Sequence, residues 1–351
     1  MTHRITTTVG KCLNGLMALT MPLALTADRA SAIPPETVGS VVSVLPVWPG
    51  RAQGGAGSRP GVAPEGSGIV MRPGIVATAW HVIEPAERID VRLSDGRVLP
   101  AQLIAKDVAT DIAVLSVEAE MPPFALAPRP GLADRACAIG NAWGLGLSVT
   151  CGVVSALDVT DAGFNPVEHF VQTDAAANPG ASGGALVDVD GRLLGMVSAI
   201  FASEGETNIG VNFAISAELL LRVVDALLDR GSVAYPNPGW RLARPSRAQL
   251  AVRAAPVVAA VEAGGNAASA EVSEGDLITV IDNRRVTTPR DAMAALARLP
   301  EGTPSVDVTV ERDGRKMVVA LPLGMQPREE ETPELFGDCP HPALVCQMRQ
   351  V

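Results

Sequence analysis

Ser182, His81 and Asp111 lie in separate segments, and their types and order suit nucleophilic catalysis. Ser182 lies in the glycine-rich segment 178–186, and each of the three residues leads into an apolar run. A serine hydroxyl is barely ionised near neutral pH, so a serine nucleophile needs a base. Histidine, with an ordinary pKa of about 6.5, can accept the proton. The pattern predicts Ser182 as nucleophile, His81 as general base then acid, and Asp111 as the carboxylate that orients His81.

The residues beside Ser182 suit the second requirement of such a reaction, stabilisation of an oxyanion. Glycines allow backbone conformations closed to other residues, so successive N–H groups can point at one spot. We expect the N–H groups of Gly180 and Ser182 to form an oxyanion hole, with Ala181 as the backbone between them. A serine in a turn, a core histidine and a strand-capping aspartate each have structural explanations. Their joint occurrence in this order favours the catalytic interpretation.

The other titratable residues form no second constellation. His169 precedes a strand and is expected near the surface, and Asp107 is expected to be a structural turn residue ahead of Asp111. No spacing of His, Cys, Asp and Glu suggests a metal site, and no loop suggests a phosphate site. We therefore expect neither a metal nor another cofactor. If His81 is the base, activity should fall below about pH 6 as its imidazole becomes protonated.

The elements that must position these residues are mostly strands. The chain has 351 residues, enough for two ordinary domains, with 34 glycines and 28 prolines. Val-rich runs separated by Gly and Pro are typical of all-β folds. Strands between residues 38 and 117, the last of them over 109–117, should close a first small barrel that carries His81 and Asp111. Strands between residues 137 and 215 should close a second that carries Ser182, with the catalytic cleft between the barrels.

The pattern changes after the second barrel. Apolar residues recur at helical spacing over 217–229, and Gly231 is a helix stop signal. The two prolines of 235–239 predict a short, stiff linker. Beyond it we expect a small α+β unit over 240–324, and then an acidic, loosely ordered tail over 325–351.

The first 32 residues have the composition of an export signal. Arg4 and Lys11 precede or open a mostly apolar stretch that ends near residue 27, and Ala30-Ser31-Ala32 matches a small-residue cleavage site. The stretch is short for a bilayer span of about 20 residues, so we expect a cleaved signal peptide rather than an uncleaved anchor. The formal net charge of −10 argues against a nucleic-acid partner, which would need a basic face.

Four of the five cysteines lie outside this segment, an even number that permits disulfides in an exported chain. A hairpin centred on Gly144 would set Cys137 and Cys151 opposite each other at a spacing that permits a bridge. Two separate buried thiols are the alternative. Cys339 and Cys346 have the same two alternatives, a small closed loop in the tail or reduced thiols.

The sequence resembles the HtrA/Deg family of serine proteases over nearly its whole length. The order His, Asp, Ser is that of chymotrypsin-like double-barrel proteases, not of subtilisins or α/β-hydrolases. The segments that resemble the family are 66–70, 77–83, 107–115, 138–141, 172–184 and 212–215. Residues 257–323, most clearly 274–278, resemble the PDZ domain that follows the protease in that family. The resemblance implies a mostly β fold, with a chymotrypsin-like double β-barrel over 36–232 and a small α+β PDZ-like domain over 240–324.

The resemblance also implies a function. Family members act in the bacterial envelope on unfolded or regulatory proteins, through an acyl-enzyme and usually as trimers. They prefer small aliphatic residues before the cut, which implies a pocket lined by Asn178, Asn212, Phe213 and Ala214. Polypeptides are the expected substrates, and a peptide is a possible ligand of the PDZ-like domain. Two alternatives are a latent protease that acts mainly as a PDZ-containing binding or holdase module, and a secreted digestive-type protease without regulation.

Several residues depart from the family pattern. Ala181 replaces the usual Asn, but it contributes only backbone, so we expect activity to be retained. Trp80 is bulky beside the base. Pro256 lies where the family has a glycine-containing carboxylate loop, and because it has no N–H to donate, it argues against capture of a peptide C-terminus. Apart from Trp48, the aromatic residues that form the trimer near the mature amino terminus are not evident.

Overall fold

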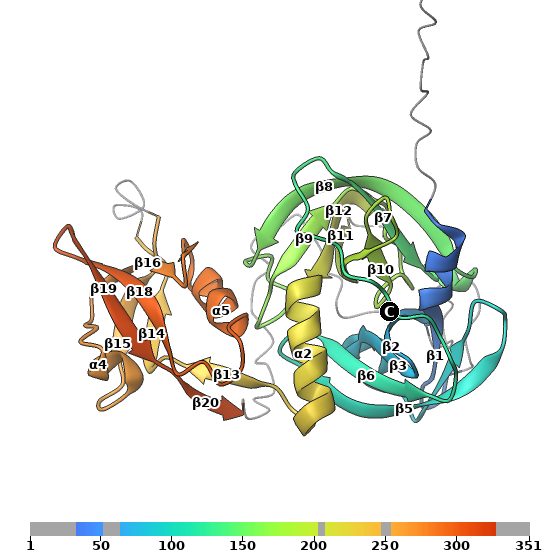
Figure 1. Ribbon diagram of the computed structural model, residues 1–351, viewed down its shortest axis with the longest axis horizontal. Coiled ribbons are helices and arrows are strands. Elements are labelled where there is room, and N and C mark those ends of the chain that lie inside the picture. The colour runs from blue at the N-terminus through green and yellow to red at the C-terminus, as the bar shows by residue number, and fades with distance from the viewer. Residues whose placement is uncertain (1–32, 52–63, 203–207, 247–253, 328–351) are drawn as a thin grey trace, which may run out of the picture. The chain divides into compact units, whose positions relative to one another are not determined.

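The computed structural model describes residues 33–51, 64–202, 208–246 and 254–327. Its elements are mostly strands, joined by short helices and turns (Figure 1). The expected signal segment 1–32 and the cysteines Cys339 and Cys346 lie outside the described residues. Among the described residues, no helix has the length and apolar character needed to cross a membrane.

The first barrel closes through six antiparallel strands. Its core consists mostly of valine, isoleucine and alanine side chains. Its strands follow the order β1-β2-β3-β6-β5-β4, and β1 pairs with both β2 and β4 to close it. The short helices η1 (Pro35–Ser40) and α1 (Trp80–Ile83) flank it. The strands are β1 (Val41–Val47), β2 (Gly66–Arg72), β3 (Ile75–Ala79), β4 (Arg88–Arg92), β5 (Val98–Asp107) and β6 (Ile112–Val117).

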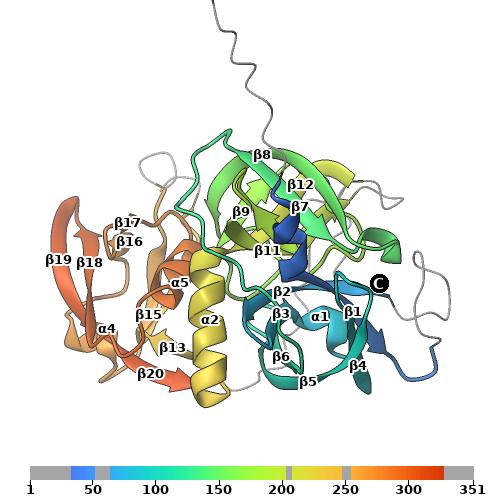
Figure 2. The same ribbon diagram turned by 45° about the vertical axis from the view of Figure 1, so that its right-hand side comes forward.

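The second barrel also has six strands, in the order β10-β11-β12-β9-β8-β7 (Figures 1 and 2). A short helix, η2 (Ala142–Gly144), lies in the connection between β7 and β8. The two closed barrels confirm the expected double-barrel fold. The strands are β7 (Arg135–Gly140), β8 (Ser148–Val159), β9 (Phe170–Thr173), β10 (Ala185–Val187), β11 (Leu193–Ala202) and β12 (Asn208–Ser216).

Helix α2 (Ala217–Arg230) follows the second barrel and contacts both barrels, through β5 and β6 on one side and β11 and β12 on the other. The Ser216 side chain caps its start by accepting from the Leu219 N–H, and Gly231 ends it in a left-handed conformation. The apolar face that periodicity predicted is buried. The helix therefore ties the two barrels together.

The carboxy-terminal part has its own apolar core beneath one antiparallel sheet. The sheet order is β14-β15-β16-β18-β19, with β17 (Arg284–Arg285) paired to β16. Helix α5 (Pro289–Ala297) starts with a capping box made by Thr288 and Asp291. The other elements are β14 (Trp240–Ala243), β15 (Val257–Val261), α4 (Asn266–Ser269), β16 (Leu277–Ile281), β18 (Ser305–Arg312) and β19 (Arg315–Pro322).

Two details of this part differ from the expectations. Strand β13 (Ala234–Asn237) pairs with β20 (Gly324–Pro327), so the first residues of the expected tail belong to a strand. Pro256 precedes β15, which is an interior strand, and its carbonyl accepts from the Ile278 N–H. A peptide could add only at a sheet edge, so the missing N–H of Pro256 does not bear on such binding.

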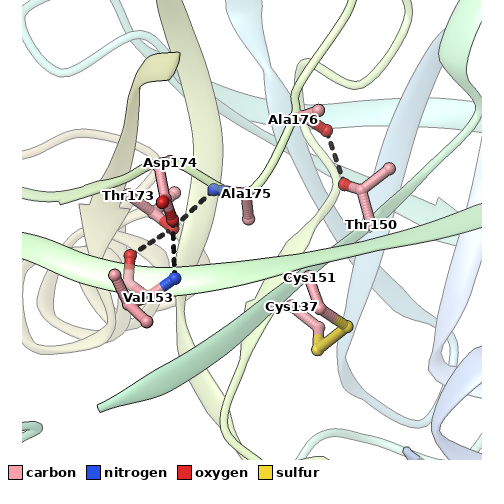
Figure 3. Close-up of a disulfide and its surroundings, with 8 residues drawn as sticks. All are labelled: Cys137, Thr150, Cys151, Val153, Thr173, Asp174, Ala175 and Ala176. Atoms are coloured by element: carbon pink, nitrogen blue, oxygen red, sulfur yellow. Dashed lines mark hydrogen bonds between the residues drawn. A yellow bond between two sulfur atoms is a disulfide. The ribbon is translucent and has the colours of Figure 1, made fainter. Parts of the chain in front are cut away.

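A disulfide joins Cys137 of β7 to Cys151 of β8 (Figure 3). The two residues are directly opposite in the strand register, with their Cα atoms 4.0 Å apart and their sulfurs 2.09 Å apart. Cys137 is buried, whereas Cys151 is exposed. Of the two alternatives left open by the sequence, the structure thus has the bridge.

Candidate active site

The pairing of two strands brings His81 and Asp111 together. His81 lies in helix α1 just after β3, and Asp111 immediately precedes β6, which pairs with β3 through Ala79 and Ile112. The His81 Nδ1 and Asp111 Oδ2 atoms are 2.6 Å apart, and the His81 backbone N–H donates to Asp111 Oδ1 over 2.8 Å. These bonds fix both the ring and the carboxylate, which is the arrangement that holds a histidine in one tautomer.

The backbone of Asp111 is strained. Its φ of 61° lies in the left-handed region, which is uncommon for a residue other than glycine. The Asp111 carbonyl accepts from the Trp80 N–H over 3.1 Å, beside the two bonds that His81 makes to the carboxylate. This set of contacts holds a conformation that would otherwise be disfavoured, as is common at functional sites.

Two opposing effects set the pKa of His81. Burial lowers it, while the charge of Asp111 and the hydrogen bond that the ring donates to that carboxylate raise it, with a further increase from Glu84. The attraction outweighs the burial, so the pKa of His81 lies above its ordinary value of 6.5. The imidazolium formed when His81 takes a proton is therefore stabilised.

Ser182 lies in the turn before β10, within residues 178–184, which we call the catalytic loop. Its hydroxyl donates to the Ser198 carbonyl over 3.4 Å, and within the described residues it has no hydrogen bond to His81. Bonds between a nucleophile and its base are often long or misaligned before substrate binds. The loop is attached to the first barrel, because the Ser67 N–H of β2 donates to the Ser182 carbonyl over 2.9 Å.

Two glycines let the catalytic loop pass close to other backbone. Gly180 has a φ of 93° and Gly183 a φ of 84°. A Cβ at Gly180 would collide with the Asn141 carbonyl, and one at Gly183 with the Ser67 carbonyl. Only glycine meets both requirements, the left-handed φ and the close approach.

The N–H groups of the loop divide into those that are bonded and those that are not. Within the described part of the chain, the N–H groups of Gly180 and Ser182 have no protein acceptor. The remaining donations are Ala181 to the Asn178 carbonyl at 2.9 Å, Gly183 to Val197 at 2.7 Å and Gly184 to Ala181 at 2.9 Å. Gly180 and Ser182 are the pair expected to bind an oxyanion, with Ala181 as the link between them. The Asn178 N–H, at the start of the loop, likewise has no acceptor among the described residues.

Of the residues expected to line the pocket, Asn178 and Asn212 contact or belong to the segment that leads to Ser182, and Phe213 and Ala214 are buried on β12. Asn212 donates from its side chain to the Ala175 carbonyl over 3.0 Å. Phe213 packs with Phe170, their ring centroids 5.6 Å apart, and Ala214 is buried beside it. Asn178 is half-buried at the start of the catalytic loop.

The expectation for Asp107 is confirmed, whereas that for His169 is wrong. Asp107 is the buried last residue of β5, and its carboxylate holds the turn that follows by accepting from the Thr110 N–H and hydroxyl, and from the Tyr235 hydroxyl over 2.6 Å. His169 is only 3% exposed. Its ring contacts Ser216 Oγ at 2.6 Å and Asp158 Oδ1 at 2.7 Å, and these distant polar partners, invisible in the local sequence, make its burial possible.

Sequence reasoning missed a buried polar cluster beside the catalytic loop. Ser67 and Asn141 are both fully buried, and Asn141 donates from its backbone to Ser67 Oγ over 2.8 Å and from its side chain to Glu65 Oε2 over 2.6 Å. Their contacts join residues 74 and 76 positions apart. The available signal was a serine between two glycines in an apolar strand, which specifies no partner.

Comparisons with known proteins agree with this architecture. The trypsin-like peptidase domain family matches residues 66–196, and the PDZ domain family matches residues 233–323. The serine endoprotease DegS of Escherichia coli K12 is 36% identical over 276 residues, covering 75% of this chain and 77% of DegS. The periplasmic serine endoprotease DegP of Salmonella typhimurium is 33% identical over 299 residues, covering 81% of this chain and 62% of DegP.

A solved structure of the HtrA-type protease AlgW with a tripeptide has a TM-score of 0.66 and 32% sequence identity, over 85% of this chain and 99% of AlgW. The paired barrels and the PDZ domain thus define a trypsin-like serine protease with a carboxy-terminal PDZ domain. The chain belongs to the HtrA/Deg family of serine endoproteases. It is therefore a peptide-bond hydrolase of the HtrA type.

Proposed function

We propose that this chain is an exported endopeptidase in which Ser182, His81 and Asp111 form the catalytic triad of a protease domain over 36–232. The observation that supports this most is that the N–H groups of Gly180 and Ser182 have no protein acceptor among the described residues. In addition, the ring and the backbone N–H of His81 are both hydrogen-bonded to the Asp111 carboxylate. Two N–H donors left without a protein acceptor beside the proposed nucleophile favour an active protease over a latent binding module.

The proposed reaction is acyl transfer in two halves. Ser182 Oγ adds to the carbonyl carbon of the scissile bond while His81 takes the hydroxyl proton, and the carbonyl oxygen becomes an oxyanion held by the Gly180 and Ser182 N–H groups. When the C–N bond breaks, His81 gives that proton to the leaving amine. Water, deprotonated by His81, then adds to the acyl carbon. The bond from that carbon to Ser182 Oγ breaks, His81 returns the proton to Oγ, and the new carboxyl end is released. No step needs a cofactor.

We assign unfolded or regulatory polypeptides as substrates, with a small aliphatic residue before the cut. The pocket would be lined by Asn178, Asn212, Phe213 and Ala214. A second peptide would bind the PDZ-like domain over 240–324 by adding to a free edge of its sheet, where β14 and β19 are the outermost strands. Because members of the family usually act as trimers, we also propose that this chain forms a homotrimer. Light scattering would measure the mass of the assembly.

We place the mature protein in the periplasm or cell envelope. The basic start, the short apolar stretch and the small residues before Ile33 favour a cleaved signal over a membrane anchor. Relatives such as DegP of Salmonella typhimurium are periplasmic endoproteases.

Replacement of the nucleophile tests the proposal. We expect Ser182→Ala to fold normally, to lose casein cleavage and to lose labelling by a fluorophosphonate, because both reactions need the hydroxyl. Wild-type protein should be labelled at Ser182, as identified by peptide mass spectrometry. A binding or holdase module would keep its partners and show no labelling in either form. Cleavage retained by purified Ser182→Ala protein would overturn the assignment of the nucleophile.

A further inference from the structure

Ser67 of β2 lies across the boundary between the barrels and contacts the catalytic loop with its side chain and its backbone. It is fully buried. Its hydroxyl donates to the Gly180 carbonyl over 2.7 Å, and its N–H donates to the Ser182 carbonyl over 2.9 Å. One residue of the first barrel therefore holds both ends of the Gly180–Ser182 backbone of the second.

The direction of each bond at the Ser67 hydroxyl is fixed by chemistry. The Asn141 backbone N–H can only donate, and it reaches Ser67 Oγ over 2.8 Å. The Gly180 carbonyl can only accept, so the single hydroxyl proton of Ser67 must point to it. Asn141 is itself held by Glu65 Oε2 and by the Gly146 N–H, which donates to Asn141 Oδ1 over 2.8 Å. The Ser67 hydroxyl thus connects the anchored Asn141 backbone to the Gly180 carbonyl through two hydrogen bonds of fixed direction.

The hydrogen bonds to the carbonyl groups of the loop show which peptide the Ser67 hydroxyl orients. A trans peptide points its C=O and its N–H in opposite directions, so a donor on the carbonyl also aims the N–H. Every carbonyl of residues 179–182 has a donor: Trp143 N–H for Pro179, Ser67 Oγ for Gly180, Gly184 N–H for Ala181 and Ser67 N–H for Ser182. The peptide held by the Ser67 hydroxyl is the central one, between those that carry the Gly180 and Ser182 N–H groups.

We propose that Ser67 is a positioning residue, whose hydroxyl holds the Gly180–Ala181 peptide so that the flanking Gly180 and Ser182 N–H groups converge on the oxyanion. This rests on the proposed function of Ser182 as nucleophile. Gly180 can adopt many backbone conformations. Without the Ser67 bond, the central peptide keeps only the bond from the Ala181 N–H to the Asn178 carbonyl, and its orientation is less fixed. Loss of the hydroxyl would also leave the Gly180 carbonyl and the Asn141 N–H buried without a partner.

The test is Ser67→Ala in the full-length protein, assayed with a peptide substrate and with a peptide aldehyde of the same sequence. Ser182 Oγ adds to the aldehyde carbon, and its oxygen becomes an oxyanion that needs both N–H groups. Loss of one oxyanion donor lowers kcat by about 10²–10³-fold, so partial misorientation should lower kcat/KM by about 10–100-fold. We expect aldehyde affinity to fall by a similar factor while KM changes little, a split that general loss of stability would not produce.

Ser43→Ala is the matched control. Ser43 is buried on β1, directly opposite Ser67 in the strand register, and within the described residues it makes no hydrogen bond to the catalytic loop. The Ser43→Ala variant should have the kcat/KM and the aldehyde affinity of the wild-type protein. If Ser67→Ala does not fold, Ser67→Cys keeps the shape with a weaker donor and should give the same loss of aldehyde affinity in smaller degree.

Wild-type aldehyde affinity and kcat in a folded Ser67→Ala or Ser67→Cys variant would overturn the inference. The wild-type protein separates this result from failure of the proposed function. If fluorophosphonate labels wild-type Ser182 and peptides are cleaved, the proposed function stands and only the role of Ser67 is refuted. If wild-type protein is neither labelled nor active, the proposed function itself fails, and with it the inference.

Discussion

The pH dependence of activity should report the environment of His81. The pKa of His81 lies above 6.5, because Asp111 outweighs the effect of burial. Only the neutral imidazole can take the Ser182 proton, so activity should fall as the pH drops through this raised pKa. We expect the half-point of kcat/KM to lie above pH 6.5, somewhat higher than the sequence alone suggested. A rate that is flat between about pH 5 and 8 would contradict the role of His81.

Asp111→Asn gives a second, sharper prediction. It removes the charge that raises the pKa of His81 and leaves the burial that lowers it, so the half-point should move to lower pH. The maximal rate should also fall, by about 10³–10⁴-fold, because the ring loses its tautomer and orientation. Glu84→Gln is the control, since Glu84 raises the same pKa only weakly and makes no bond to the ring among the described residues. An unchanged half-point in Asp111→Asn would refute this account.

At this scale the sequence was informative about residues that do chemistry and silent about those that hold them. Ser182, His81 and Asp111 could be selected because the reaction needs their functional groups. Ser67 and Asn141 could not, since a serine and an asparagine have structural uses everywhere, and their partners lie far along the chain. The burial of His169 was missed for the same reason.

Strands β7 and β8 are joined by a bond that can be removed without touching the triad. The disulfide closes a separation of 14 residues, for which the chain-entropy account gives at most about 3 kcal/mol. We expect Cys137→Ser with Cys151→Ser to lower the thermal midpoint of the protease domain by about 5–10 °C in calorimetry. The pair Cys339→Ser with Cys346→Ser should leave that midpoint unchanged. Equal melting of both double variants would show that the bridge adds no stability.

The disulfide also borders the segment before the catalytic loop (Figure 3). On β8, Thr150 Oγ1 donates to the Ala176 carbonyl over 2.5 Å and the Val153 N–H donates to Asp174 Oδ1 over 2.6 Å. Loosening β8 should therefore affect the second barrel first. Hydrogen exchange of the double variant should rise in β8 and in 173–176, with β1–β6 protected as before.

The sequence predicted element boundaries well where a turn signal was strong, and it predicted them poorly where the backbone conformation was unusual. The helix after the second barrel ends at Arg230, one residue beyond the expected end and directly before Gly231. A strand was expected over 109–117, but β6 begins at Ile112. The difference is the left-handed Asp111, a strained conformation that no composition or periodicity predicts.

At the scale of the whole molecule, export is the testable expectation. In cells with an intact export pathway we expect the mature protein to begin at Ile33, because Ala30-Ser31-Ala32 precedes it. Amino-terminal sequencing and intact mass would show a chain shortened by residues 1–32, recovered in the soluble envelope fraction. A full-length chain that sediments with membranes would instead identify these residues as an anchor. The fold class was predictable at this scale, because Val-rich runs separated by Gly and Pro indicate strands and because residues 257–323 resemble a PDZ domain.

The disulfide between Cys137 and the exposed Cys151 has a practical consequence for anyone who produces this enzyme. Protein purified from a reducing host cytosol will carry free thiols at 137 and 151, and its batches will differ with their exposure to air. Thiol titration should accompany every activity measurement, and secretion into an oxidising compartment is the preparation that yields one uniform species.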